Sequence, residues 1–303
     1  MKRILITGID GFVGRNLVDA WMHNYDLIGL DLPPDLFNTE HEDVVKWHSS
    51  INQADIRENA SYYEFLLEGV DIVIHCAART RINSSWAEYD DYYNTNIIGS
   101  HRLFEASQRY GVKKFIYFSS SSVYGNGVGN PSKETDALHP TNPYAVSKAA
   151  AEMALTAQSI KSETELIIVR PFTMYGEHMN YGKYSLAIAK FLRLAQEGKP
   201  LMIDGTGEQR RDFVHVSDAI RALELILEQG RNGDIYNIGT GQTVSVQELA
   251  DAVSTRQVRV PDRIGAVATT CADITRLQRL GYQPTIKVLD WLTARVKELK
   301  LKQ

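Results

Sequence analysis

Short apolar runs alternate with longer stretches of helical periodicity over residues 1–170 of the chain. The runs predict strands, and the stretches between them, where apolar positions recur every three or four residues, predict helices. Strict alternation of strand and helix is typical of a parallel, doubly wound sheet with right-handed crossovers. The strands are predicted at residues 4–6, 27–30, 44–47, 71–75, 114–119 and 165–170, and the helices at residues 12–22, 62–67, 89–110 and 144–160.

The rhythm of the pattern changes after Pro171, where the elements become shorter and less regular. We therefore expect an α/β protein in which a smaller C-terminal α/β lobe follows the doubly wound sheet. Part of the C-terminal half is expected to thread back into the first domain. The predicted first domain comprises residues 1–170 with 213–238, and the predicted lobe comprises residues 171–212 and 239–303.

The elements of the C-terminal half are also predicted from apolar runs and polar boundaries. Ser217 and Asp218 follow an apolar run, and their side-chain oxygens are typical helix caps, so a helix is expected from there to residue 227. The other predicted helices are residues 184–196, 244–253, 274–280 and 288–300, and the predicted strands are residues 201–203, 213–216 and 235–238.

Composition excludes several classes of protein. Of the 303 residues, 44% are hydrophobic and 23% charged, as in an ordinary globular protein, and the net charge of -4 gives no basic field for nucleic acid. Cys76 and Cys271 suggest no disulfide framework, and the N-terminal apolar run is too short for a signal peptide. No apolar run approaches a membrane span. We expect a cytoplasmic protein with no nucleic-acid or membrane partner.

A glycine-rich segment lies between the first strand and the first helix. Gly8, Gly11 and Gly14 there allow a tight turn, close backbone approach and close helix packing, and the helix N-terminus offers N–H groups to a pyrophosphate. Asp31 ends the next strand, where a carboxylate accepts from both ribose hydroxyls and repels a 2′-phosphate. The arrangement predicts a dinucleotide site that prefers NAD to NADP, and it disfavours a purely structural turn.

Two further pairs of residues are candidates for this cofactor site. Asp55 and Ile56 form a predicted adenine clamp, the carboxylate for the amino group and the isoleucine for the ring face, although a lone loop aspartate is more often simply solvated. Ala77 and Ala78 close the fourth strand with small side chains. A cofactor is therefore expected to lie directly against their backbone.

Two polar residues near these strand ends are predicted to have structural roles. His75 has no partner cluster at the spacing of metal ligands, so we interpret it as a packed histidine and expect no metal site. Asn96 lies inside the long predicted helix, where asparagine is a poor helix former. A buried amide that braces the adjacent strand ends would explain its position.

Tyr144 and Lys148 are four residues apart and lie on one face of a predicted helix. A free tyrosine has a pKa of about 10, and a nearby ammonium together with a positive nicotinamide ring would favour the phenolate. Tyr144 is therefore predicted to remove a proton from a substrate hydroxyl. Ser120, at the end of a serine-rich buried strand, would hold the same oxygen. This context disfavours a chance Tyr-x-x-x-Lys pattern on a solvated helix.

Together these motifs resemble those of the extended short-chain dehydrogenase/reductases that act on nucleotide sugars. The resemblance covers nearly the whole chain and implies a Rossmann-type domain with a small substrate lobe, tightly held NAD, a nucleotide-sugar (UDP-sugar) substrate and a homodimer formed through the two long helices. It implies that Ser120, Tyr144 and Lys148 are the catalytic triad. It also implies that the cofactor site is lined by Phe12, Val13, Asn96, Tyr144, Lys148 and Pro171. The motifs are Thr7-Gly8-x-x-Gly11-Phe12-x-Gly14, Asp31, His75-x-Ala77-Ala78, Asn96, residues 119–125, Pro143-Tyr144-x-x-Ser147-Lys148, Arg170-Pro171-Phe172, Arg211-Asp212-Phe213 with residues 214–218, and Ala272-Asp273-Ile274.

The same resemblance implies substrate contacts in the C-terminal half. Arg211 and Arg263 would grip the pyrophosphate of the sugar nucleotide, which suits two guanidinium groups; each alone could also be a surface charge. Tyr175 would pack beside the nicotinamide, with a core tyrosine as an equal alternative. The segment 252–263 is shorter than in the family and Ala266 replaces a common acid, which puts the role of Arg263 in doubt.

The residues after Ser120 bear on the reaction. Family 4,6-dehydratases have Asp and Glu where this chain has Ser121 and Ser122, and family uronate decarboxylases keep a Glu at the second position. The resemblance therefore favours a 4-epimerase, which oxidises C4 transiently and returns the hydride to the other face. Thr173 replaces a common Asn, as in uronate 4-epimerases, so Ser121, Ser122 and Thr173 are predicted to bind a C5 carboxylate. Lys183 either replaces an arginine usual in those relatives or is a solvated charge.

UDP-glucuronate is the first choice of substrate, and UDP-glucose/galactose is the second. A nucleotide-sugar reductase or dehydratase of the same family is a further alternative, although Asp31 counts against an NADP-dependent reductase. A non-catalytic NAD-binding protein ranks last, because Tyr144 and Lys148 are both present.

Overall fold

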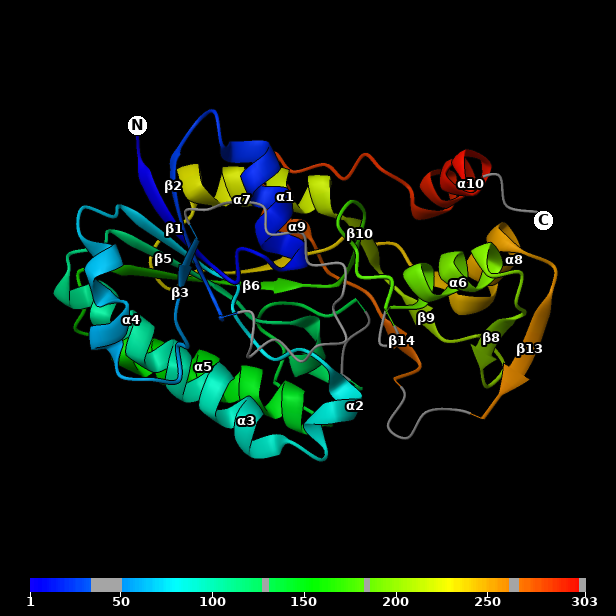
Figure 1. Ribbon diagram of the computed structural model, residues 1–303, viewed down its shortest axis with the longest axis horizontal. Helices are drawn as coiled ribbons and strands as arrows, with labels where there is room; N and C mark the ends of the chain where they lie inside the picture. The colour runs from blue at the N-terminus through cyan, green and yellow to red at the C-terminus, as the bar shows by residue number, and fades with distance from the viewer. Residues whose placement is uncertain (34–50, 127–130, 183–185, 262–266, 300–303) are drawn as a thin grey trace. The chain divides into compact units, whose positions relative to one another are not determined.

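The computed structural model describes residues 1–33, 51–126, 131–182, 186–261 and 267–299 (Figure 1). The chain forms two compact units, and each of them contains segments that are distant in sequence. The first unit comprises Met1–Val123, Pro140–Arg170 and Ile226–Tyr236, and the second comprises Tyr124–His139, Pro171–Leu225 and Asn237–Gln303.

In the part of the chain that the structure describes, the largest sheet has seven strands in the order β11-β6-β5-β4-β1-β2-β3. Neighbouring strands pair in parallel, and the order reverses between β1 and β4, which pair Thr7 with His75 at their carboxyl ends. This topology confirms the predicted doubly wound fold and makes the β1/β4 strand ends its switch point, where such folds bind ligands. The strands are β1 (Arg3–Thr7), β2 (Asp26–Asp31), β3 (Ile51–Gln53), β4 (Ile72–His75), β5 (Lys114–Phe118), β6 (Glu165–Pro171) and β11 (Ile235–Ile238).

Helices α3, α4 and α5 cover one face of this sheet, and α1 lies on the opposite face (Figure 1). Apolar side chains of the sheet and the helices form one core, which includes Leu5, Val73, Phe104, Phe115 and Leu155. The helical elements of the first unit are α1 (Phe12–Trp21), η2 (Ala60–Tyr62), η3 (Glu64–Leu67), α2 (Ile82–Ser85), α3 (Tyr89–Tyr93), η4 (Asn94–Gly99), α4 (Ser100–Arg109) and α5 (Pro143–Ser159); η5 (Ser121–Tyr124) begins there.

The long helix predicted at residues 89–110 contains a π-helical segment. Its middle, η4, is one wide turn between two α-helical parts. The side chain of Asn96 in this turn is fully buried and bonds to polar groups outside the helix. Polar side chains that compete with the helical ladder produce such local widening, which is frequent at functional sites.

The second unit contains three small sheets, as the prediction of a smaller α/β lobe requires. Buried Asp212 accepts hydrogen bonds from Thr240 and from the N–H groups of Gly241 and Ala272, which ties three chain segments together. The sheets pair β10 (Phe213–His215) with β7 (Thr173–Tyr175), β9 (Arg210–Arg211) with β12 (Val244–Ser245) and β14 (Thr269–Thr270), and β8 (Leu201–Asp204) with β13 (Gln257–Val260). The helices are α6 (Ala187–Gln196), α7 (Val216–Gln229), whose last turn belongs to the first unit, α8 (Val246–Val253), α9 (Thr275–Gln278) and α10 (Val288–Glu298).

Two local predictions need correction or lie outside the described residues. Helix α7 begins at Val216, so Ser217 and Asp218 lie in its first turn and do not cap it. The carboxylate of Asp218 instead accepts from the backbone N–H groups of Thr285 and Ile286. The strand predicted at residues 44–47 lies outside the described residues, and the strand found beside β2 is β3, which the pattern did not predict.

Within the described ranges, no helix combines the length and the apolar composition that spanning a bilayer requires. The same ranges contain no group of three or more His, Cys, Asp or Glu side chains arranged to hold a metal ion.

Arg170 and Glu152 form a buried bidentate ion pair between β6 and α5, with N–O distances of 3.0 and 2.6 Å. Their side chains are only 3% and 5% exposed. Breaking a buried pair leaves an uncompensated charge, so Glu152→Gln should destabilise the protein by about 3–5 kcal/mol. Urea denaturation checks this, with Glu105→Gln, which removes an exposed partner of Arg109, as the matched control. Equal midpoints for the two variants would contradict the prediction.

Candidate functional site

The glycine loop is packed tightly against the strand ends. Gly8 has a φ of +71°, and a Cβ there would lie 2.8 Å from the backbone nitrogen of Ala77. A Cβ on Gly14 would lie 2.5 Å from the carbonyl oxygen of Gly8. Helix α1 begins directly after Gly11 and has no acidic residue in its first turn, which suits an anion at its N-terminus. The loop therefore fits the pyrophosphate of a dinucleotide, with Phe12 in the first helical turn.

Asp31 lies at the carboxyl end of β2, beside the glycine loop. Its Oδ2 accepts from the Asp10 N–H and its Oδ1 from the Leu32 N–H, both at 2.8 Å. Burial nevertheless raises the pKa of this carboxyl to about 6. The carboxylate is thus fixed in position and has lone pairs left for ribose hydroxyls, as predicted for an NAD site.

Because the pKa of Asp31 is raised, NAD binding should weaken as the pH falls. The ionised carboxylate accepts hydrogen bonds, and it is present above pH 6 and lost as the pH falls through about 6. The Kd of NAD should therefore be about tenfold higher at pH 5 than at pH 7.5. Calorimetric titration of the NAD-free protein checks this, and Asp31→Asn should abolish the difference. The same Kd at both pH values in the unsubstituted protein would contradict it.

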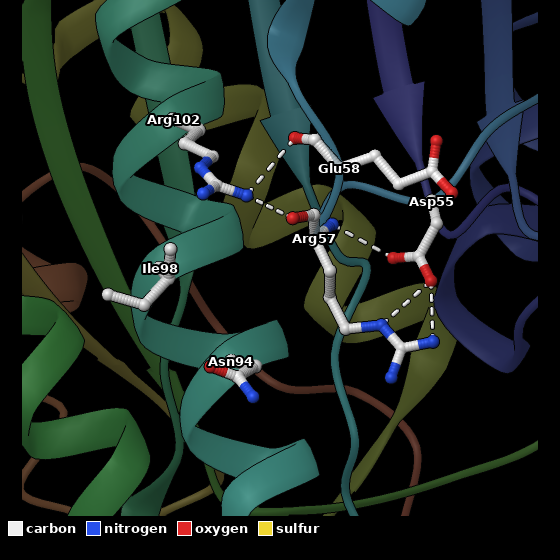
Figure 2. Close-up of a pocket in the computed structure, with 6 residues that line it drawn as sticks. All are labelled: Asp55, Arg57, Glu58, Asn94, Ile98 and Arg102. Atoms are coloured by element: carbon white, nitrogen blue, oxygen red, sulfur yellow. Dashed lines mark hydrogen bonds and ion pairs between the residues drawn. The ribbon is translucent and has the colours of Figure 1, made fainter.

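The predicted adenine clamp has partners of its own. Asp55 accepts from the N–H and the guanidinium of Arg57, at 2.8 and 2.7 Å. Ile56 is buried and packs against Gly99 of η4, so a role in binding adenine stays a prediction for both. Figure 2 shows Arg57 turned toward Asp55 and Arg102 reaching the backbone oxygens of residues 57 and 58. Asp55, Arg57 and Arg102 line a pocket of about 460 Å³, together with Glu58, Asn94 and Ile98.

Asn96 joins the end of β4 to helix α5. Its Oδ1 accepts from the Arg79 N–H, and its Nδ2 donates to the Arg79 carbonyl oxygen, both at 2.9 Å. The same amide donates to Ser147 Oγ at 2.8 Å. The side chain thus holds the segment that follows Ala77 and Ala78, in the manner that the sequence analysis anticipated for a buried amide.

Helix α5 places Tyr144 and Lys148 on successive turns. Asn142 caps the helix by accepting from the Ala145 N–H at 2.9 Å, and Pro143 occupies its first position. Tyr144 therefore lies in the first turn, close enough to Ser120 for that hydroxyl to affect the pKa of the phenol. These two and Lys148 are all buried.

The pKa values of this group reflect its burial. Burial raises the pKa of Tyr144, and the neighbouring Ser120 hydroxyl opposes the shift. Burial also lowers the pKa of Lys148 to about 8. The Lys148 ammonium donates to the Phe118 carbonyl oxygen at 2.7 Å and lies 4.9 Å from the centre of the Tyr117 ring. In the protein alone, Tyr144 is thus a phenol, and the nicotinamide charge invoked for the phenolate acts only with cofactor bound.

The two serines after Ser120 lie in the short 3₁₀ turn η5. Ser121 and Ser122 are half-buried, and the Ser122 N–H donates to Ser120 Oγ at 3.1 Å. The carboxylate on α5 one turn after Lys148 is Glu152, and both of its oxygens bond to Arg170. Hydroxyl groups therefore occupy the turn beside Ser120.

The remaining predicted residues lie in the second unit or outside the described residues. Pro171 ends β6 and is buried, whereas Thr173 is half-buried and begins β7. Arg211 is half-buried in β9, where its Nη1 donates to the Arg210 carbonyl oxygen at 2.7 Å. Arg263 lies outside the described residues, as do Lys183 and Ala266, so their roles stay predictions.

Tyr175 is a core residue of the second unit. It is 1% exposed, and its ring packs edge-on against His215 and Trp291, with centroid distances of 5.1 and 5.2 Å. This packing favours the alternative of a core tyrosine, which the sequence analysis left open, over a place beside the nicotinamide.

Three polar residues of this region were not singled out as site residues from the sequence. Thr7 and Ser100 both bond to the ring of His75, at 2.7 and 2.8 Å, and Ser147 bonds to Asn96. Ser147 could have been identified from the sequence, because it lies three residues after Tyr144 and hence on the same helical face. The other two are 68 and 25 residues from His75, so only the fold brings them together.

The glycine loop directly follows β1, and the Lys148 ammonium donates to Phe118, the last residue of β5. Both parts of the candidate site thus lie at the carboxyl ends of strands of one parallel sheet, which is the arrangement of a dinucleotide-binding α/β fold. The chain belongs to the NAD dependent epimerase/dehydratase family, whose model matches residues 4–239. The family confirms the predicted resemblance and the NAD cofactor. The chain is thus an NAD-dependent enzyme of a nucleotide-sugar epimerase/dehydratase type.

Relatives within this family have different activities. A dTDP-D-glucose 4,6-dehydratase of Mus musculus is 35% identical over 258 residues, which cover 82% of this chain and 71% of the relative. UDP-glucose 4-epimerase of Thermotoga maritima, solved with UDP-glucose, has a TM-score of 0.89 at 30% identity and 98% coverage of both chains. A UDP-glucuronic acid 4-epimerase variant of Bacillus cereus, solved with NAD and UDP-4-deoxy-4-fluoro-glucuronic acid, has a TM-score of 0.86 at 29% identity, with 98% and 99% coverage.

Proposed function

We propose that the protein is an NAD-dependent nucleotide-sugar 4-epimerase whose preferred substrate is UDP-glucuronate. The observation that carries the proposal is the buried group of Tyr144 and Ser120, whose hydroxyl acts on the pKa of the phenol, with Lys148 on the next turn and with hydroxyl side chains, not carboxylates, at residues 121 and 122. This set provides acid–base chemistry on one oxygen and lacks a second acid beside it.

The residues of the chain would handle the proton of the C4 hydroxyl. NAD, when bound in the glycine loop, supplies a hydride acceptor and donor. Tyr144 would take the hydroxyl proton as the C4–H bond breaks, while Ser120 holds the same oxygen. Lys148 would stabilise the phenolate by its charge. After rotation of the keto sugar, Tyr144 returns the proton as the hydride returns to the opposite face, so no net oxidation occurs.

The main alternative within the family is a 4,6-dehydratase, as the mouse relative is named. Elimination of a hydroxyl group requires a proton donor and a base beyond the Tyr144 group. Ser121 and Ser122 stand where the sequence resemblance places those acids. Glu152 is buried and bound through both oxygens to Arg170, which argues against its serving as a substitute.

The choice of sugar rests on small hydroxyl residues. Ser121 and Ser122 would offer hydroxyl donors to a C5 carboxylate, and a charged acceptor makes such hydrogen bonds stronger than neutral ones; for Thr173 the same role stays a prediction from the sequence. The similarity to the Bacillus cereus epimerase supports this choice. UDP-glucose is the second candidate, because the Thermotoga maritima epimerase is similar over the same length.

Proton NMR of separate incubations with UDP-glucuronate, UDP-glucose and dTDP-glucose tests the proposal. We expect an anomeric signal of UDP-galacturonate to grow at least about tenfold faster than that of UDP-galactose. Ser122→Ala should reduce this ratio, and Ser84→Ala, in the helix α2, is the matched control. Faster formation of UDP-galactose would overturn the substrate, and a 4-keto-6-deoxy product from dTDP-glucose would overturn the reaction.

A further inference from the structure

We propose that His75 is a positioning residue that fixes the cofactor loop and Tyr144 relative to one another through an ordered chain of buried hydrogen bonds. The inference rests on the proposed function in one respect, since it takes Tyr144 as the acid–base group. The ring of His75 lies at the switch point of the sheet, where β4 ends beside β1.

The direction of the hydrogen bonds on both sides of the His75 ring follows from one donor, the hydroxyl of Ser100. Ser100 Oγ donates its proton to the Asn96 carbonyl oxygen at 2.7 Å. It therefore accepts from His75 Nε2, at 2.8 Å, so Nε2 carries the ring proton. Nδ1 is then the acceptor and receives the hydroxyl proton of Thr7 at 2.7 Å. Thr7 Oγ1 in turn accepts from the Ala77 N–H at 3.2 Å.

The surroundings of the ring keep it neutral, as this chain requires. His75 is 1% exposed and packs against Phe115 and Tyr117, with ring-centroid distances of 5.7 and 5.8 Å. Burial, with a smaller effect from the positive charge of Lys148, lowers the pKa of His75 to about 3. An imidazolium would have two donors and no acceptor for the Thr7 hydroxyl.

The hydrogen bonds on each side of the His75 ring lead to a different part of the candidate site. Thr7 directly precedes Gly8, whose Cβ position is blocked by the backbone of Ala77, so the Nδ1 side of the ring fixes the loop. On the Nε2 side, Ser100 binds the π-helical turn that carries Asn96. The amide of Asn96 donates to Ser147 Oγ at 2.8 Å.

Ser147 completes the connection to the acid–base group. Its hydroxyl donates to the carbonyl oxygen of Tyr144 at 2.7 Å. One imidazole thus contacts both the segment that fits the pyrophosphate and the segment that orients the phenol. Reacting groups must be placed to within a fraction of an ångström. Loss of the hydrogen bond at Nε2 should therefore affect kcat, and loss of the hydrogen bond at Nδ1 should affect the Kd of NAD.

Two amide substitutions test the hydrogen bonds at Nδ1 and at Nε2 separately. Asn places its amide near the position of Nδ1, and Gln places its amide near Nε2. His75→Asn, which keeps the Thr7 side, should lower kcat about tenfold and change the Kd of NAD less than twofold; His75→Gln should do the reverse. His75→Phe should show both defects. Unchanged constants in His75→Phe, or the same pair of defects in both amide variants, would overturn the proposal.

A spectroscopic measurement on the unsubstituted protein keeps the proposal testable if the variants fold poorly. Nitrogen-15 NMR of the histidine-labelled protein should show His75 as the neutral Nε2–H tautomer from pH 5.5 to 8. The Nδ1–H tautomer, or titration within this range, would overturn the chain. Neither this spectrum nor the Kd of NAD depends on any sugar substrate, so a failure of the proposed function leaves both results independent.

Discussion

Replacement of Tyr144 by phenylalanine should lower kcat about 10³-fold while the Kd of NAD changes by less than about threefold. The phenol is the proposed acid–base group next to Ser120, and positioned proton transfer contributes 10²–10⁴-fold to catalysis. The ring itself is retained, so its packing against Tyr92, at a centroid distance of 6.4 Å, should persist. Steady-state kinetics and titration with NAD measure the two quantities.

Tyr92 provides the matched control for this experiment. It is also buried, and its hydroxyl donates to the Arg81 carbonyl oxygen at 2.6 Å. Tyr92→Phe removes one hydrogen bond from the same aromatic pair, and we expect kcat to change less than about fivefold. A Tyr144→Phe enzyme with more than a tenth of the original kcat would assign the proton transfer to another group.

Replacement of Lys148 by methionine should lower kcat about 10²-fold. The ammonium lies one helical turn after Tyr144 and donates to the Phe118 carbonyl oxygen, and in the proposed mechanism its charge stabilises the phenolate of Tyr144. Methionine retains much of the volume of the buried stem, so the free energy of unfolding should change less than kcat suggests. Kinetics with saturating NAD and substrate give the direct measurement.

Lys114 is a suitable control because its ammonium also donates to carbonyl oxygens, those of Leu227 and Gly230, at 3.1 and 3.0 Å. Lys114→Met should reduce stability and leave kcat within about twofold. Equal losses of kcat in the two lysine variants would mean that the effect of Lys148 is structural and not chemical.

The parts of the fold that the sequence predicted depend on local patterns. Short apolar runs such as that of β4, which is buried along its whole length, are typical of strands in a sheet that is covered on both faces. The glycine loop and the spacing of Tyr144 and Lys148 are also local. The structure places the loop directly after β1, and it places Lys148 in α5 with its ammonium bonded to the last residue of β5. These features depend on neighbours within about ten residues, which a single sequence contains.

The parts that the sequence did not predict depend on contacts between distant segments. In the π-helical turn, the amide of Asn96 bonds to Arg79 and to Ser147. The helical periodicity of the sequence does not indicate these two contacts. Asp218 resembles a helix cap in sequence, yet its carboxylate holds the backbone at residues 285 and 286. His75 was correctly interpreted as packed, but its two partners could not be identified before the strand order was known.

The most direct test of the central claim follows the hydrogen at C4 of the sugar. The enzyme would be incubated in ordinary water with UDP-glucuronate deuterated at C4, and the product would be examined by NMR and mass spectrometry. Transient oxidation with return of the same hydride predicts UDP-galacturonate that retains the deuterium at C4. Replacement of the deuterium by a solvent proton would contradict this account, because C4 would then exchange as an acid and not as a hydride.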